Sequence, residues 1–357
     1  MAAGDDRVHR GTTRVGLNAT ALFEGGSGVQ TYIRELLRAF GELEPGALEN
    51  CAVTAIVDQQ VAASVPRSLA VRATRADTGL RRKIRSLVPT RGFEVVHGLD
   101  VDVPVVAAGA RRVATIHDLA QLDTPWAFGK SGIVKRRLVE VACRRADTLI
   151  AVSAFTAERI RTRFGRDSVV VHEAPRPFLH APTADDIARV RRRFALPGDF
   201  VLHVGNLEPR KDVTTLAAAC RAAGVPLMLV GGAVQTVDVP NGAHALGYVD
   251  DADLAAFYAA ATVVAYVSRY EGFGLPPIEA LASGATVMAT RVGALPDVAP
   301  TGISFVPIGD VDAQAARLRE LFADGDQRRE LAAAGLAEVR RLSWTTTATQ
   351  TAAVWRP

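Results

Sequence analysis

The sequence predicts two α/β domains, each built on a doubly wound parallel sheet, that face each other across a cleft. Short β-branched runs alternate with longer amphipathic stretches, a pattern typical of parallel sheets covered by helices on both faces. This alternation runs through the chain twice, with an interruption near residue 180. A chain of 357 residues is also long for one hydrophobic core and suits two domains of roughly 150–200 residues each.

The individual elements follow from apolar periodicity. The expected strands are 15–17, 53–57, 95–96, 113–116, 148–152 and 169–171 in the first half, and 200–204, 227–230, 263–266 and 286–289 in the second. Helical spacing predicts helices over 31–40, 134–145 and 185–194. Three prolines, Pro175, Pro177 and Pro182, place the linker near residues 174–184.

Composition is that of an ordinary globular protein, with 48% hydrophobic and 22% charged residues. No apolar run approaches the roughly 20 residues that a membrane-spanning helix needs. Residues 1–14 are polar and lack the apolar stretch of a signal peptide, so we expect a cytoplasmic protein. The three cysteines are far apart and have no metal-ligand spacing, which indicates small buried side chains in a reducing compartment.

Positive charge is concentrated in the first half of the chain. Residues 1–180 hold 26 Lys and Arg against 19 Asp and Glu, whereas residues 181–357 hold 16 against 19. Two basic clusters contribute: Arg81, Arg82, Lys83 and Arg85, and then Lys130, Lys135, Arg136 and Arg137. They are either solvated helix faces or a contact for an anionic partner, such as a membrane surface or a charged acceptor. Nucleic acid is not indicated, since no aromatic residues or recognition motif accompany the charge.

The segment 268–284 carries the richest set of functional residue types. It follows the expected strand 263–266 and contains Gly272 and Gly274, which allow close backbone approach to a ligand. A helix over 276–282 would begin at a proline, and its free N–H groups would form a site for phosphate. Glu271 and Glu279 flank this helix start, so both can face one pocket. The alternative is a surface turn with exposed glutamates, but this would not explain why glycines, prolines and acids occur together here.

A cationic pair follows the strand 200–204. Arg210 and Lys211 lie in the loop before a helix that should start near Val213. Because Arg offers a planar fork and Lys a point charge, the pair suits a diphosphate clamp, with a solvated turn as the alternative.

Two further features lie at strand ends. His117 closes the strand 113–116 and is followed by Asp118, so both should face the cleft. The loop 24–32 is glycine-rich, and Gly28, with Gly26 next, is the best candidate for approaching a phosphate. Its pattern does not match the dinucleotide-binding fingerprint, because Thr31 stands where the third glycine belongs.

With these motifs, the chain resembles glycosyltransferase family 4, the retaining enzymes of GT-B fold. The family's donor motif Glu-Gly-Phe-Gly-Leu-Pro-x-x-Glu is present over 271–279, and its Gly-x-Leu-x-x-x-Lys-Asn pattern is matched except for Asp212. The resemblance implies that Glu271 contacts the transferred sugar and Glu279 the ribose. It also implies that the backbone of Phe273, Gly274 and Leu275 holds sugar and phosphate. His117, by its side chain or its carbonyl, would lie beside the reacting sugar.

The resemblance divides the chain into an acceptor-binding domain (1–177), a sugar-nucleotide domain (178–340) and a helix returning to the first domain (341–357). Where relatives have Pro-Asn-Gly between the domains, this chain has Glu-Ala-Pro-Arg-Pro at 173–177. The acids Asp250, Asp251 and Asp253 look like a metal-binding motif, but helix capping explains them better.

We therefore expect a retaining hexosyltransferase that uses a nucleotide-diphospho-sugar and needs no metal or other cofactor. The alternatives are a sugar-nucleotide epimerase of the same architecture and a catalytically silent sugar-nucleotide-binding protein. The donor base stays open between uridine and guanosine. The acceptor stays open among a lipid-linked glycan, a lipid and a small metabolite, with a peripheral position at the inner face of the membrane as a possibility.

Overall fold

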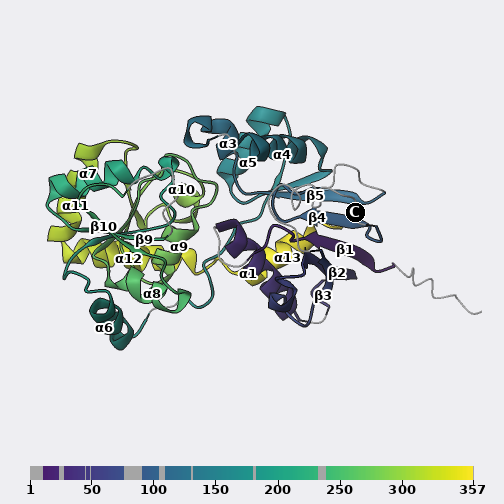
Figure 1. Ribbon diagram of the computed structural model, residues 1–357, viewed down its shortest axis with the longest axis horizontal. Helices are drawn as coiled ribbons and strands as arrows, with labels where there is room; N and C mark the ends of the chain where they lie inside the picture. Colours follow the sequence, from purple (N-terminus) through teal and green to yellow (C-terminus); the bar gives the residue numbers. More distant parts are fainter. Residues whose placement is uncertain are drawn as a thin grey trace, which may run out of the picture.

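The computed structural model describes residues 11–23, 28–44, 46–48, 50–75, 91–103, 109–129, 132–179, 182–231 and 239–356. These residues form two lobes, each with a central sheet and helices packed around it (Figure 1).

The amino-terminal lobe contains a seven-stranded parallel sheet in the order β3-β2-β1-β4-β5-β6-β7. Its strands are β1 (Thr13–Asn18), β2 (Cys51–Asp58), β3 (Ala70–Thr74), β4 (Val95–Gly98), β5 (Arg111–Ile116), β6 (Thr148–Ala151) and β7 (Val169–Val170). Its helices are α1 (Gly28–Glu42), α3 (Ala120–Asp123), α4 (Gly132–Arg145) and α5 (Ala154–Phe164), with short 3-10 turns η1 (Ala62–Ser64) and η2 (Pro125–Ala127).

The carboxyl-terminal lobe contains a six-stranded parallel sheet in the order β10-β9-β8-β11-β12-β13. Its strands are β8 (Val201–Val204), β9 (Leu227–Val230), β10 (Ala243–Gly247), β11 (Val263–Tyr266), β12 (Val287–Thr290) and β13 (Ile303–Val306). Its helices are α6 (Ala184–Arg193), α7 (Val213–Ala223), α8 (Asp251–Ala260), α9 (Leu275–Ala282), α10 (Leu295–Val298), α11 (Val311–Ala323) and α12 (Gly325–Val339), with the 3-10 turn η3 (Pro209–Lys211).

Both sheets are doubly wound, as the sequence predicts. In β8, Val201 belongs to the apolar core on one face and the next residue, Leu202, to the core on the other. Each sheet is therefore buried on both faces, which explains why its strands are continuous apolar runs rather than alternating ones. The strand order reverses between β1 and β4 in one lobe and between β8 and β11 in the other.

Three strands are not predicted by the apolar pattern: β3, β10 and β13. Each of them lies at an edge of its sheet. The residues of β3 are mostly exposed, as are those of β10, so these segments lack the apolar run that reveals a central strand.

The last helix, α13 (Trp344–Ala353), packs against α1 of the first lobe, and the two helices lie side by side in Figure 1. Beyond it, the Trp355 ring stacks on Phe40 at a centroid distance of 5.2 Å. Arg111 donates to the carbonyl oxygen of Val354 at 2.7 Å. The chain thus passes from one lobe to the other twice. None of the helices in the described ranges has the length and apolar composition that crossing a bilayer requires.

Candidate active site

A cavity of about 680 Å³ lies between the two lobes. Its walls include Gly28, His117 and Lys135 from the first lobe and Lys211 and Glu271 from the second. Loops that leave the carboxyl ends of strands on either side of a reversal in strand order separate and form a crevice. The cavity combines the crevices of both sheets.

A buried ion-pair cluster lies at the reversal between β8 and β11. Lys211 and Arg210 follow β8, and Glu271 follows β11. The Lys211 Nζ lies 2.5 Å from Glu271 Oε1, and Arg210 Nη1 lies 3.0 Å from Oε2. Burial opposes ionisation of Glu271, but the charges of Arg210 and Lys211 lower its pKa to about 2. Glu271 is thus shared between two cations, and Arg210 Nε also pairs with Glu208 Oε2 at 2.7 Å. All four side chains line the cavity.

The cluster rests on an aromatic pair. The Lys211 ammonium also bonds to the Tyr266 hydroxyl, and the His203 ring stacks on Tyr266 at 5.6 Å. His203 Nδ1 lies 3.1 Å from the carbonyl oxygen of Ala265, which makes Nδ1 the protonated nitrogen. Burial lowers the pKa of His203 to about 4, so the ring is neutral. His203 supports the site from behind rather than lining it.

The turn after Lys211 explains the one departure from the family's motif. Asp212 has a left-handed φ of 54°. Asn and Asp both tolerate this conformation because their side chains bond locally, and Asp212 Oδ1 accepts from Thr215 Oγ1 at 2.8 Å. The exchange of Asn for Asp leaves the turn intact.

Two helix starts face each other across the cavity. Helix α9 begins at Leu275, after Gly274 in a left-handed conformation (φ 98°), and α1 begins at Gly28. A Cβ at Gly28 would lie 3.8 Å from the Leu275 side chain, so the two ends are in contact distance. Gly28, Gly274 and Leu275 all line the cavity, and the amino end of a helix suits an anion.

Gly272 is required by the close approach of the two lobes. A Cβ at this position would lie 1.7 Å from the carbonyl oxygen of His117. Ser153 of the first lobe also donates to the Gly272 carbonyl oxygen at 2.6 Å. The donor-motif loop therefore packs directly on the strand end that carries His117.

The His117 side chain is fully engaged within the protein. Its Nδ1 lies 3.0 Å from Glu173 Oε1 and its Nε2 lies 3.0 Å from the Leu99 carbonyl oxygen. Both partners only accept hydrogen bonds, so the ring donates from both nitrogens. Burial lowers the pKa of His117, but the hydrogen bond and charge of Glu173 outweigh burial and raise it. The His117 carbonyl oxygen lies against Gly272 and also accepts a hydrogen bond from Thr156 Oγ1 at 3.3 Å.

Glu279 lies inside α9, with its side chain 4% exposed. Arg176 holds it with two parallel bonds, Nε to Oε1 at 2.6 Å and Nη2 to Oε2 at 2.9 Å. Burial raises the pKa of Glu279, and the charge of Arg176 opposes that rise. Arg176 and Glu173 were not among the predicted site residues. The sequence signal for them was the linker 173–177, which differs from the Pro-Asn-Gly of relatives. The sequence does not reveal that these two side chains pair with His117 and Glu279.

The acidic run at the start of α8 corrects one prediction. Asp250 is the residue before the helix, but its side chain makes no capping bond. Asp251 and Asp253 instead pair with arginines: Asp251 with Arg176 at 2.5 Å, and Asp253 with Arg193 at 2.7 Å. In the described ranges no group of three or more His, Cys, Asp or Glu side chains is placed to hold a metal ion.

The first lobe provides a wall with unused polar groups. Gln121 is 7% exposed, and its Oε1 has no hydrogen-bond partner among the described residues. Lys135 makes no hydrogen bond to any described residue, and the nearby charge of Asp100 raises its pKa. Phe128 lines the cavity beside them. Asp118 Oδ1 accepts from the Ala120 amide at 2.9 Å, so Asp118 stabilises the local turn.

Some predicted residues fall outside the described ranges. They are Gly26, the basic residues at 81–85, and Lys130. Arg136 and Arg137 lie on α4 and pair with Glu140 at 3.3 and 3.0 Å.

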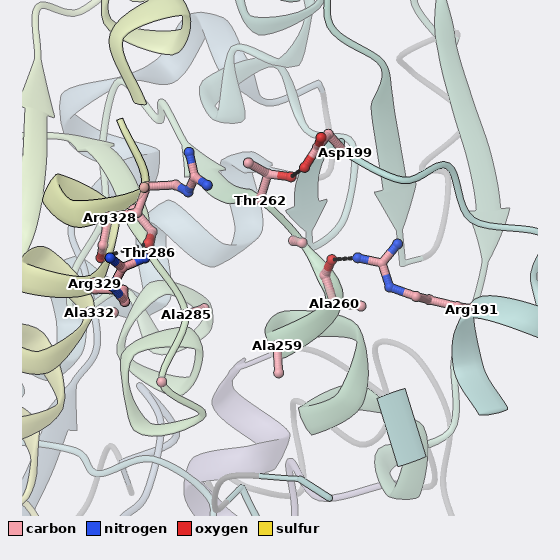
Figure 2. A pocket seen from close by; sticks show the side chains of 13 residues that line it. Arg191, Asp199, Ala259, Ala260, Thr262, Ala285, Thr286, Arg328, Arg329 and Ala332 are labelled. Carbon is pink, nitrogen blue, oxygen red and sulfur yellow. Dashed lines mark hydrogen bonds between the residues drawn. The ribbon is translucent and has the colours of Figure 1, made fainter. Parts of the chain in front are cut away.

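A second cavity, of about 320 Å³, lies at the other end of the second sheet (Figure 2). Thr262 and Thr286 line it, directly before β11 and β12. Its arginines are occupied, since Arg191 donates to the Ala260 carbonyl oxygen at 2.6 Å and Arg329 pairs with Asp326. It lies at the amino ends of the strands, opposite the edge where doubly wound sheets bind ligands.

Two doubly wound lobes with a cavity between them are the arrangement of the GT-B fold. Two sequence comparisons agree. The family "Glycosyl transferases group 1" matches residues 186–337, and "Glycosyltransferase Family 4" matches residues 26–176. The chain belongs to the group 1 glycosyltransferases.

Individual relatives share the class. The chain is 29% identical to the O-antigen chain mannosyltransferase B of Escherichia coli, over 68% of this chain and 69% of that protein. It is 30% identical to the MMP alpha-(1->4)-mannosyltransferase of Mycolicibacterium hassiacum, over 77% of this chain and 73% of that protein. Among solved structures, HepE of Anabaena in complex with UDP-glucose superposes with a TM-score of 0.74 at 17% identity, covering 96% of this chain and 98% of that chain.

Proposed function

We propose that the protein is a retaining hexosyltransferase that moves a sugar from a UDP- or GDP-sugar to a hydroxyl acceptor without a metal ion. The observation that carries this proposal is the buried cluster of Arg210, Lys211 and Glu271 between the starts of α1 and α9. Two cations and two helix starts supply the positive potential that a departing diphosphate needs.

Donor binding in this proposal is an exchange of partners. The diphosphate takes over Arg210 and Lys211 from Glu271, and the freed carboxylate accepts hydrogen bonds from the hydroxyls of the transferred sugar. The backbone N–H groups of Gly28, Gly274 and Leu275 complete the phosphate site. Phe273 directly precedes Gly274 in the loop before α9. Glu279 accepts the hydroxyls of the ribose.

The chemical step breaks the bond between the sugar C1 and the phosphate oxygen, and the electron pair leaves with the diphosphate. The acceptor oxygen forms its bond to C1 from the same face, and its proton passes to the leaving phosphate. In this proposal Glu271 acts through hydrogen bonds to the sugar hydroxyls rather than as a nucleophile, so that retention proceeds without a covalent sugar–enzyme intermediate. His117 cannot serve as a base through a ring whose two nitrogens both donate. In this proposal it supports the cavity wall beside the transferred sugar.

A mannosyl donor is the best-supported sugar, because two of the relatives named above are mannosyltransferases. The acceptor would bind to the wall of the first lobe that carries Gln121, Phe128 and Lys135, where polar groups lack partners. In this division of labour, residues 1–177 bind the acceptor, 178–340 bind the sugar nucleotide, and 341–357 join the two.

Peripheral contact with the inner face of the membrane is also proposed. The exposed face of α4 combines Arg136 and Arg137 with Ile133 and Val134, which are 62% and 41% exposed. Basic and apolar side chains together suit an anionic lipid surface. Sedimentation with vesicles of anionic and of neutral lipid tests this, and equal partition with both would refute it.

The proposed function is tested by thermal unfolding with UDP, GDP, UDP-glucose and GDP-mannose. A nucleotide that binds the native state raises the unfolding temperature with its concentration. We expect one base to be preferred, the preferred donor to be hydrolysed slowly without acceptor, and EDTA to leave this activity unchanged. An absence of any stabilisation would refute the donor site, and binding without hydrolysis would favour a silent binder.

A further inference from the structure

The linker between the lobes carries an arginine that is fully engaged in the donor half of the cavity. Besides its two bonds to Glu279, Arg176 donates from Nη1 to Asp251 Oδ1 at 2.5 Å. Its guanidinium carbon lies 5.1 Å from the centre of the Phe178 ring, and its side chain is 13% exposed. All three guanidinium nitrogens have partners, and Arg176, Asp251 and Glu279 all line the cavity.

We propose that Arg176 is a positioning residue that holds the Glu279 carboxylate in the orientation that reads the ribose diol, and thereby sets the preference for a ribonucleotide donor over a 2′-deoxyribonucleotide. This inference rests on the proposed function. Each carboxylate oxygen offers about two acceptor sites. Arg176 occupies one site on each oxygen. The second site on Oε1 remains for one hydroxyl of the diol, and the second site on Oε2 is held only by the long bond from Tyr258 at 3.4 Å, which the other hydroxyl can replace.

The geometry explains why this position requires arginine. Two parallel bonds from a planar fork fix the plane of the carboxylate, whereas lysine would supply a single point of contact. The other hydrogen-bonding neighbour, the Tyr258 hydroxyl, lies 3.4 Å from Glu279 Oε2 and holds it weakly. A buried carboxylate without its cation takes up a proton or turns toward water, and either change removes an acceptor for the diol.

The position of Arg176 in the chain adds a link between the lobes. Glu173, three residues earlier, holds His117 of the first lobe, and the carbonyl oxygen of Pro175 accepts from Trp344 Nε1 at 3.1 Å. One stretch of four residues therefore fixes the carboxylate that reads the ribose and the histidine on the opposite wall.

The test compares ribo- and deoxyribonucleotides. Isothermal titration would measure dissociation constants for UDP and dUDP, and for GDP and dGDP, with the wild type and with Arg176→Met, Arg176→Lys and Glu279→Gln. In the wild type we expect the deoxy form of the preferred base to bind at least roughly tenfold more weakly, because a hydrogen bond to a charged group is lost. In Arg176→Met the ratio should fall to within about twofold, while the affinity for the deoxy form changes by less than about threefold.

Arg176→Lys should give a deoxy-to-ribo ratio of dissociation constants between those of the wild type and Arg176→Met. Combining Arg176→Met with Glu279→Gln should not lower this ratio below that of Arg176→Met alone. The matched control is Arg193→Met, which removes an arginine paired with Asp253 on the same helix α8 and should keep the wild-type ratio. Circular dichroism checks folding, and the Lys variant carries the test if the Met variant does not fold. Retention of the wild-type ratio in both Arg176 variants overturns the inference, as does a wild type that binds ribo and deoxy forms equally. A wild type that binds none of the four nucleotides instead refutes the proposed function.

Discussion

Lys211 and Glu271, which are 60 residues apart in the chain, meet with 2.5 Å between Nζ and Oε1 at the point where the strand order of the second sheet reverses. Both side chains are less than a tenth exposed. Each is the other's ionic partner. If the proposed donor binds here by taking Lys211 from Glu271, its affinity should include the free energy of breaking this pair.

Replacing Lys211 should affect turnover more than donor binding. In Lys211→Ala, kcat at saturating donor should fall by roughly 10²–10³, because one of the cations that meets the developing charge is lost. Lys211→Arg keeps the charge and should retain more activity. Initial rates at saturating donor test this, and a wild-type kcat in Lys211→Ala would contradict the role of the ammonium.

Replacing Glu271 should separate nucleotide binding from catalysis. In Glu271→Gln the buried Lys211 loses its anionic partner, whereas Arg210 keeps Glu208, and the unliganded protein should be destabilised by about 3–5 kcal/mol. Free UDP or GDP should then bind more tightly than to the wild type, since the Glu271 carboxylate no longer competes for Lys211 and Arg210, while transfer of the sugar falls. Calorimetric unfolding with and without nucleotide measures both effects. Weaker nucleotide binding in the variant would show that the carboxylate does not compete with the diphosphate.

Replacing Glu279 should act on donor affinity. Glu279→Ala removes the acceptor for the ribose and leaves Arg176 with Asp251 alone, so the dissociation constant for the donor should rise roughly tenfold or more. The change in kcat should be smaller, because the diphosphate clamp remains. Glu330→Ala, at an exposed position of α12, is the control. Titration of both variants with the donor measures this effect. An unchanged dissociation constant for the donor in Glu279→Ala would exclude contact between Glu279 and the ribose.

The stability of the protein should decrease in mild acid because of His203. Burial lowers its pKa to about 4, below the ordinary value of about 6.5. Between these values the unfolded chain binds a proton that the folded chain does not, so the free energy of unfolding falls as the pH drops from about 6.5 to about 4. Each pKa unit corresponds to about 1.4 kcal/mol, so the loss is on the order of 3 kcal/mol.

His203→Phe tests this contribution. The ring can still stack on Tyr266. The bond from Nδ1 to the Ala265 carbonyl oxygen is lost, which lowers the stability at every pH but does not add a pH dependence. Urea unfolding at several pH values should give a shallower pH dependence for the variant than for the wild type. Equal slopes would show that His203 does not titrate in this window.

Much of this architecture could be predicted from local sequence. The central strands are continuous β-branched runs, and the donor motif 271–279 lies directly after one of them, so its place at a strand's carboxyl end follows from the pattern. The edge strands β3 and β10 were missed because exposed edges carry no apolar run.

Pairings between distant residues could not be predicted. Arg176 and Glu279 are 103 residues apart, and no spacing rule connects them. The acids at 250–253 show the same limit: a helix start favours Asp through its free N–H groups, but the tertiary fold assigns Asp251 and Asp253 to arginines. Local rules describe which residue types can stand at a position, whereas the partner depends on which elements the fold brings together.

The two passages of the chain between the lobes meet at one junction. One passage is the linker that contains Arg176, and the other precedes α13, where Trp344 donates from Nε1 to the Pro175 carbonyl oxygen of the first passage. Glu173 and Arg176 of the same linker hold His117 of one lobe and Glu279 of the other. A substitution at Trp344, far from the cavity in sequence, therefore acts on the segment that supports both walls.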